Sequence, residues 1–205
     1  LAGCAEGQQA EVAEVPAGPK PFDKPISFQS YGMRRQVGED FPGMMASVKE
    51  LGYGAMEMCS PRGPHYQEVG FGNLTDLPGE EVAQMIADAG LICKGSHFES
   101  REIIGADEAE TREKASASAE YAVSLGLIDV IMSGSGLSGE ATIDQFRRWG
   151  ELCSVAGEVM KDAGLRLGYH NHAIGPVMED GETLQYDFIM SVCDPDLVGM
   201  QFQLL

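Results

Sequence analysis

From residue 26 onward, short apolar runs alternate with stretches of helical periodicity. Six apolar runs begin 28 to 38 residues apart, at Ile26, Gly54, Leu91, Leu127, Leu165 and Leu197. Between them apolar residues recur at the i, i+3, i+4 spacing of one helix face, as in Phe41, Met44, Met45, Val48 and Leu51. This alternation predicts six β/α units, in which parallel strands form a sheet and the helices lie outside it.

A glycine follows four of the predicted helices. Gly52, Gly90, Gly126 and Gly164 each precede the next apolar run within about two residues, where glycine accepts the left-handed conformation that ends many helices. Such a repeat forms either a doubly wound open sheet or an eight-stranded barrel, and a barrel needs about 250 residues and eight units. Because the sequence stops inside the sixth run, we expect an α/β fold: a (β/α)8 TIM barrel, here incomplete with six β/α units present.

Composition limits the possible partners. The chain has 205 residues, of which 43% are hydrophobic, so it can bury a sizeable core. It carries 32 acidic against 14 basic side chains, a formal net charge of −18, with no basic cluster. Nucleic acid and anionic membrane surfaces are therefore excluded as partners. The acidic excess is compatible with a bound divalent cation and with a neutral small-molecule sugar.

The cysteines predict no disulfide framework or structural zinc site, because their number is odd and no CxxC pair is present. Cys4 stands apart. The segment Leu1-Ala2-Gly3-Cys4 resembles the lipobox of a bacterial lipoprotein, and an acidic stretch follows it. We expect residues 1–25 to be a lipobox remnant and flexible tether, and residues 26–205 to be the barrel domain. The resemblance implies lipidation at Cys4 and a place on the periplasmic side of the cell envelope. The lipid anchor would then be the one membrane contact of the protein. The alternative is a cytoplasmic protein.

Two of the four histidines, His170 and His172, flank Asn171 directly after the fifth apolar run. Alternation along a strand sends both imidazoles to the same side. Neutral imidazole is the commonest metal ligand, and its proton moves near neutral pH. Both residues are therefore candidate catalytic residues and metal ligands. The alternative is a polar pair that satisfies the backbone of a loop.

With this motif on its fifth strand, the chain resembles the sugar phosphate isomerase/epimerase family, the xylose isomerase-like TIM barrels. The other segments that carry the resemblance are Met56-Glu57-Met58, Gly95-Ser96-His97-Phe98 and the run from Asp194 to Met200. The family implies a divalent metal ion (Mn, Mg, Co or Zn) at the carboxyl end of the barrel. Many members have carboxylates where His170 and Gln203 stand here, so the resemblance implies that His170, His172 and Gln203 hold the metal.

Other polar residues follow the remaining predicted strands. Because the carboxyl ends of parallel strands form the active face of a barrel, these residues are candidate substrate contacts. They are Tyr31, Arg34, Glu57, His97 and Glu99. Glu57 could instead pair with Lys94. His65, in the long loop 60–79, is expected to be a surface histidine.

The resemblance implies a metal-dependent sugar or keto-sugar isomerase or epimerase that abstracts a proton next to a carbonyl. The neutral residues at positions 170 and 203 remove carboxylates that such a reaction uses. They leave two alternatives open. One is a keto-sugar dehydratase or hydratase, which is a lyase; the other is a non-catalytic, lipid-anchored sugar-binding protein.

Overall fold

The computed structural model describes residues 24–137, 141–172 and 181–203, and the structural statements below concern these residues. The lipobox, the lipidation predicted at Cys4 and most of the predicted tether lie outside them. No helix in the described ranges combines the length and the apolar character that crossing a bilayer requires.

Six parallel strands form one sheet, and each begins close to a predicted apolar run. They are β1 (Ser27–Gln29), β2 (Ala55–Cys59), β3 (Ile92–Glu99), β4 (Asp129–Ser133), β5 (Arg166–His170) and β6 (Val198–Gln201). Each strand pairs with the next one along the chain. A doubly wound sheet reverses its strand order part-way, whereas this order runs from β1 to β6 without reversal. The barrel arrangement is therefore confirmed, with six of its parallel strands described.

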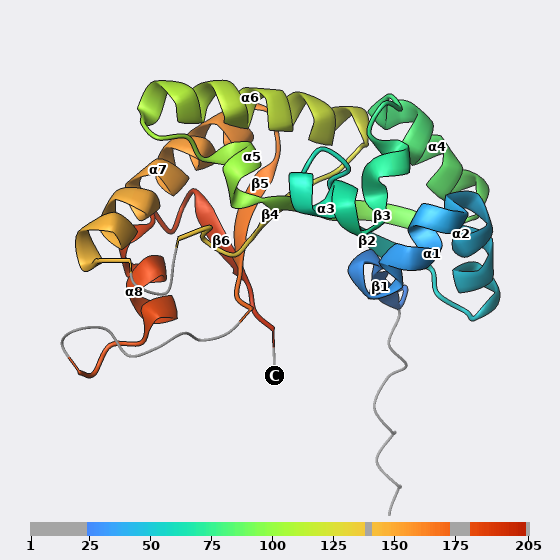
Figure 1. Ribbon diagram of the computed structural model, residues 1–205, viewed down its shortest axis with the longest axis horizontal. Helices are drawn as coiled ribbons and strands as arrows, with labels where there is room; N and C mark the ends of the chain where they lie inside the picture. The colour runs from blue at the N-terminus through green and yellow to red at the C-terminus, as the bar shows by residue number, and fades with distance from the viewer. Residues whose placement is uncertain (1–23, 138–140, 173–180, 204–205) are drawn as a thin grey trace, which may run out of the picture.

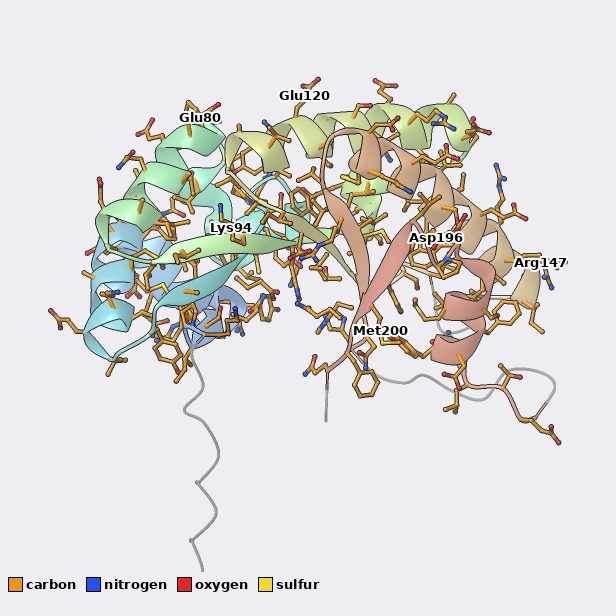
Figure 2. The ribbon with its side chains drawn as sticks, turned by 180° about the vertical axis from the view of Figure 1, so that it is seen from behind. Glu80, Lys94, Glu120, Arg147, Asp196 and Met200 are labelled. Atoms are coloured by element: carbon orange, nitrogen blue, oxygen red, sulfur yellow. The ribbon has the colours of Figure 1, made fainter. Side chains whose placement is uncertain are left out.

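Helices cover the outer face of the curved sheet (Figure 1). They are α1 (Arg34–Glu39), α2 (Phe41–Glu50), α3 (Pro64–Val69), α4 (Gly79–Asp88), α5 (Ser100–Ile103), α6 (Glu108–Ser124), α7 (Ile143–Asp162) and α8 (Gln185–Val192), with the short 3-10 helices η1 (Ser30–Met33) and η2 (Phe71–Leu74). Figure 2 shows Glu80 on α4 and Glu120 on α6 pointing away from the sheet. Part of the negative charge thus lies on the solvated helix surface.

The predicted apolar faces pack between the helices and the sheet. On α7, Trp149, Leu152, Cys153 and Ala156 are all buried. The helix starts at a capping box, in which the Gln145 backbone N–H donates to Thr142 Oγ1 at 3.3 Å and the Thr142 N–H donates to the Gln145 side chain. One expectation on α2 was wrong. Leu51 is 76% exposed, because α2 ends at Glu50 and Leu51 is the residue that caps its carboxyl end at the surface.

The four helix-ending glycines have the backbone that the sequence predicts. Gly52, Gly90, Gly126 and Gly164 have φ values of 93°, 75°, 72° and 78°. The long connection 60–79 is not a plain loop, because it contains α3 and η2. These two short helices place His65 and Tyr66 beside the carboxyl ends of the strands.

Candidate functional site

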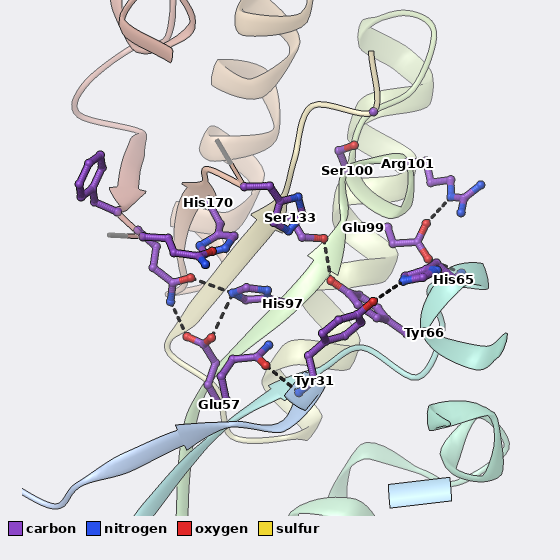
Figure 3. Close-up of a pocket in the computed structure, with 16 residues that line it drawn as sticks. Tyr31, Glu57, His65, Tyr66, His97, Glu99, Ser100, Arg101, Ser133 and His170 are labelled. Atoms are coloured by element: carbon purple, nitrogen blue, oxygen red, sulfur yellow. Dashed lines mark hydrogen bonds and ion pairs between the residues drawn. The ribbon is translucent and has the colours of Figure 1, made fainter. Parts of the chain in front are cut away.

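A cavity of about 940 Å³ opens at the carboxyl ends of the strands. Figure 3 shows its lining, with Glu57, His97 and His170 on one side and His65, Tyr66 and Glu99 on the other. Of the candidate site residues, those that line the cavity are Tyr31, Glu57, His97, Glu99, His170, His172 and Gln203. The parallel sheet brings them together because each lies within a strand near its carboxyl end or just beyond it, at the same edge of the sheet.

Three imidazoles form a cluster in this cavity. The ring centroids of His97 and His170 are 4.6 Å apart, and those of His170 and His172 are 5.2 Å apart. Burial lowers the pKa of His170, and the neighbouring rings of His97 and His172 lower it further. Burial, followed by the nearby His97, also lowers the pKa of His172. Both rings are therefore favoured as neutral imidazoles, the form that can accept a proton or bind a metal.

Glu57 is paired with His97, and the alternative partner Lys94 instead donates to the Gly126 carbonyl at 3.0 Å. Glu57 Oε1 lies 3.0 Å from His97 Nε2, and its Oε2 accepts a hydrogen bond from the Gln201 amide. Burial alone would raise the pKa of Glu57. The hydrogen bonds from His97 and Gln201, together with the nearby imidazoles, more than offset this, so the pKa is lowered. Glu57 is therefore held as a carboxylate.

Asn171 aligns the chain beyond the two strands. Its side chain is fully buried, and it accepts from the Gln203 backbone N–H at 2.8 Å and donates to the Gln203 carbonyl at 3.3 Å. These two bonds continue the β5–β6 pairing past the point where the strands end. Gln203 is thereby held beside the histidine pair.

An aromatic wall faces the imidazole cluster. It consists of Tyr31, His65 and Tyr66, whose ring centroids are 5.8 to 6.3 Å apart. The Tyr31 hydroxyl is 3.0 Å from His65 Nε2, and the Tyr66 hydroxyl is 2.6 Å from the Ser133 hydroxyl. Aromatic faces with polar edges of this kind suit the mixed surface of a sugar ring.

Two carboxylates hold the base of this wall. Glu99 Oε1 accepts from the His65 backbone N–H at 2.5 Å, and its other oxygen is paired with Arg101. Glu102 accepts from the Ser60 hydroxyl at 2.6 Å and from the Glu99 backbone N–H at 2.7 Å. Burial raises the pKa of Glu102 to about 7.

Arg34 does not line the cavity. Its guanidinium lies 4.5 Å from the centre of the Tyr31 ring and donates to the Tyr31 carbonyl at 3.0 Å, so it supports a lining residue from behind.

His65 is exposed, as expected of a surface histidine, yet it also stands at the cavity rim. Sequence reasoning also missed Tyr66 and Gln201. Alternation could have found Gln201, because it lies two residues before Gln203 on the same strand side.

Among the described residues, no three His, Cys, Asp or Glu side chains are grouped closely enough to hold a metal ion. A metal ion held by His170 and His172 would therefore need the amide oxygen of Gln203 as its third protein ligand. The chemistry of that set suits a divalent metal, because imidazole nitrogen and amide oxygen are both common ligands. The buried Nδ1 atom of His170 also has no hydrogen-bond partner. These three residues therefore fit a metal ion.

Comparison with known proteins places the chain in a family. The family model of the xylose isomerase-like TIM barrel matches residues 45–202. The chain belongs to this family. No match is found among curated proteins.

Solved structures of the xylose isomerase-like fold share the architecture at low identity. A sugar phosphate isomerase/epimerase from Parabacteroides distasonis is 23% identical with a TM-score of 0.72, over 91% of this chain and 68% of that one. A probable 3-DHS dehydratase from Bacillus anthracis is 14% identical with a TM-score of 0.60, over 87% and 62%. A xylose isomerase-like TIM barrel protein from Mycobacterium smegmatis, in complex with magnesium, is 16% identical with a TM-score of 0.57, over 86% and 63%.

Proposed function

We propose that the protein is a metal-dependent sugar or keto-sugar isomerase or epimerase that removes a proton next to a carbonyl group. The observation that carries this proposal is the joint placement of Glu57, His97, His170 and His172 in one cavity at the carboxyl ends of the strands. Membership of the xylose isomerase-like family supports an enzyme of this class. The similar protein from P. distasonis is a sugar phosphate isomerase/epimerase, which agrees with the proposal.

Each residue has a role in this proposal. His170, His172 and Gln203 would hold the metal, and the similar M. smegmatis protein contains magnesium. When bound, a divalent cation polarises the carbonyl and stabilises the negative charge left by proton removal. His97, the member of the imidazole cluster outside this ligand set, accepts and returns the proton. Tyr31 and Glu99 line the opposite wall, where they can orient sugar hydroxyls.

A calorimetric titration with Mn²⁺ tests the metal part of the proposal. The wild-type protein should bind one Mn²⁺, and His170→Ala should weaken binding by at least about tenfold, because even residues outside the ligand set change affinity by that much. His65→Ala is the matched control, since it removes an imidazole from the other wall and should leave the affinity unchanged. Absence of Mn²⁺ binding by the wild type, or equal binding by His170→Ala, would contradict the proposal.

A lyase is the second candidate, because His170 and Gln203 are neutral at positions where many family members carry carboxylates. The similar B. anthracis protein is a probable dehydratase. Mass spectrometry of 2-keto- and 3-keto-sugars after incubation separates the reactions. A change of one water identifies a dehydratase or hydratase, whereas a new chromatographic peak of unchanged mass identifies an isomerase. Saturable sugar binding without any conversion would instead support the non-catalytic sugar-binding protein.

Envelope anchoring through Cys4 is a separate proposal that rests on the Leu1-Ala2-Gly3-Cys4 segment. It predicts that the protein from bacterial cells fractionates with membranes and carries a lipid mass on Cys4. Cys4→Ser should release it into the soluble fraction. A protein that fractionates as soluble with an unmodified Cys4 would contradict anchoring and support the cytoplasmic alternative.

A further inference from the structure

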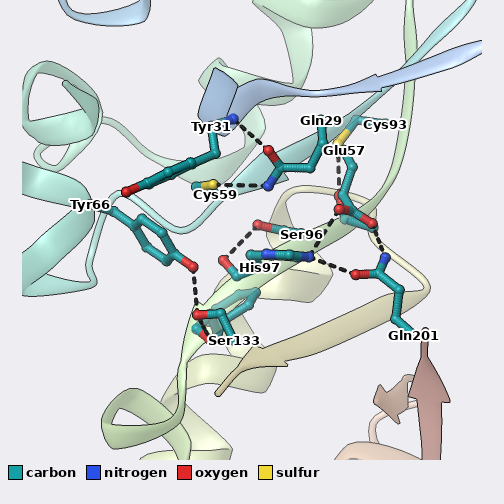
Figure 4. Close-up of polar contacts among 12 residues, drawn as sticks. Gln29, Tyr31, Glu57, Cys59, Tyr66, Cys93, Ser96, His97, Ser133 and Gln201 are labelled. Carbon is teal, nitrogen blue, oxygen red and sulfur yellow. Dashed lines mark hydrogen bonds and ion pairs between the residues drawn. The ribbon is translucent and has the colours of Figure 1, made fainter. Parts of the chain in front are cut away.

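Gln201 lies between Glu57 and His97, and its amide satisfies both partners in one orientation only. Its Nε2 donates to Glu57 Oε2, and its Oε1 is 2.7 Å from His97 Nε2 (Figure 4). A carboxylate can only accept hydrogen bonds, so the amide nitrogen must face Glu57. The opposite orientation would press two acceptor oxygens together. The amide oxygen is therefore the atom that faces His97.

This orientation determines where the proton of His97 is. The Nε2 atom of His97 faces two acceptors, Gln201 Oε1 at 2.7 Å and Glu57 Oε1 at 3.0 Å. An unprotonated Nε2 would leave three acceptor atoms together with no hydrogen among them. His97 is only 6% exposed, so water has little room to compensate for that arrangement.

We propose that Gln201 is a positioning residue which, with Glu57, holds His97 as the tautomer protonated on Nε2. The Nδ1 atom is then the proton-accepting atom of the ring. This tautomer deepens the proposed function, because it identifies Nδ1 as the atom of His97 that can take a proton in the reaction. The tautomer itself does not depend on any reaction.

The position of Gln201 in the sheet explains why it can do this. Gln201 pairs in register with His170 across β5 and β6, and Glu57 comes from β2 on the far side of β3. The amide therefore reaches across the cavity and links β6 to β2 and β3. A shorter or apolar side chain at position 201 would leave both Glu57 and His97 without this partner.

Nitrogen NMR of the imidazoles tests the proposal directly. Long-range ¹H–¹⁵N spectra of chelator-treated protein at pH 8 distinguish the two neutral tautomers, since an ordinary imidazole has a pKa of about 6.5. The His97 signals are assigned from their loss in His97→Asn. The expected result is a protonated Nε2 and an unprotonated Nδ1. A protonated Nδ1, alone or together with Nε2, would overturn the proposal even if no variant could be purified.

Variants separate the role of Gln201 from that of Glu57. Gln201→Leu should raise the share of the Nδ1-protonated tautomer about tenfold, the effect of losing one net hydrogen bond. Gln29→Leu is the control, because this cavity amide contacts Cys59 and the Tyr31 backbone and should leave His97 unchanged.

An unchanged tautomer ratio in Gln201→Leu would also overturn the proposal. The measurement uses no substrate, so its outcome is independent of the proposed reaction. If the wild type shows the expected tautomer but converts no sugar, the proposed function fails and the role of Gln201 stands.

Discussion

The buried amide of Asn171 makes two hydrogen bonds with the backbone of Gln203, one from each of its polar atoms. The polar atoms of the Asn171 side chain thereby take the place of backbone groups and extend the β5–β6 pairing. Because the bonds go to backbone atoms, the identity of the side chain at position 203 does not affect them. Asn171 can therefore hold the segment in place while Gln203 faces the cavity.

This relationship predicts different costs for two neighbouring truncations. Asn171→Ala leaves the Gln203 backbone groups without their partners, and the free energy of unfolding should fall by about 1 to 3 kcal/mol. Gln203→Ala keeps both bonds and should change stability by less than about 0.5 kcal/mol. Urea denaturation of both variants measures the difference. Equal losses would show that the Asn171 bonds do not stabilise this segment.

Gly70 predicts a second pair of matched variants. Its φ is +142°, and an added Cβ would lie 1.8 Å from the Arg34 carbonyl oxygen. Gly52 has a φ of +93° with open space around it. Gly52→Ala should cost about 1 kcal/mol through backbone strain alone, whereas Gly70→Ala adds a clash and should cost about 3 kcal/mol or more. Thermal or urea denaturation measures both. Similar costs would mean that the contact between Gly70 and α1 is easily relaxed.

Glu102 predicts a pH dependence of stability. Burial raises its pKa to about 7 in the folded protein from a usual value of 4.5. Between these pH values the folded state binds more protons than the unfolded state, so the free energy of unfolding falls as pH rises through this window. Glu102→Gln stays neutral and lacks this contribution. Relative to that variant, the wild type should lose on the order of 2 to 3 kcal/mol between pH 4.5 and pH 8.

The measurement is urea denaturation of both proteins at several pH values across this range. Glu80→Gln, at an exposed position of α4, serves as the control and should parallel the wild type. A wild type that parallels Glu102→Gln as well would contradict the account of a buried, neutral Glu102.

Local signals in the sequence predicted most of the fold. Strand runs, helix faces and closing glycines act over a few residues, so their periodicity is visible without the structure. The sequence also predicted that His97 and His170 lie on the same face of the barrel, because strand ends share one edge. His65 and Tyr66 were missed as site residues because α3 has six residues, too few to show a periodic face. Alternation from Gln203 could have placed Gln201 in the cavity, but its contact with Glu57 joins residues 144 positions apart, which only the assembled sheet brings together.

Incubation of keto-sugars with the protein in D₂O, with and without Mn²⁺, tests the central claim most directly. Removal and return of a proton next to a carbonyl must place solvent deuterium on that carbon. The account predicts deuterium at the carbon adjacent to the carbonyl of a 2-keto- or 3-keto-sugar when Mn²⁺ is present, and loss of this incorporation in a chelator or in His170→Ala. Complete absence of deuterium from every keto-sugar, with Mn²⁺ bound to the protein, would contradict proton abstraction at this site.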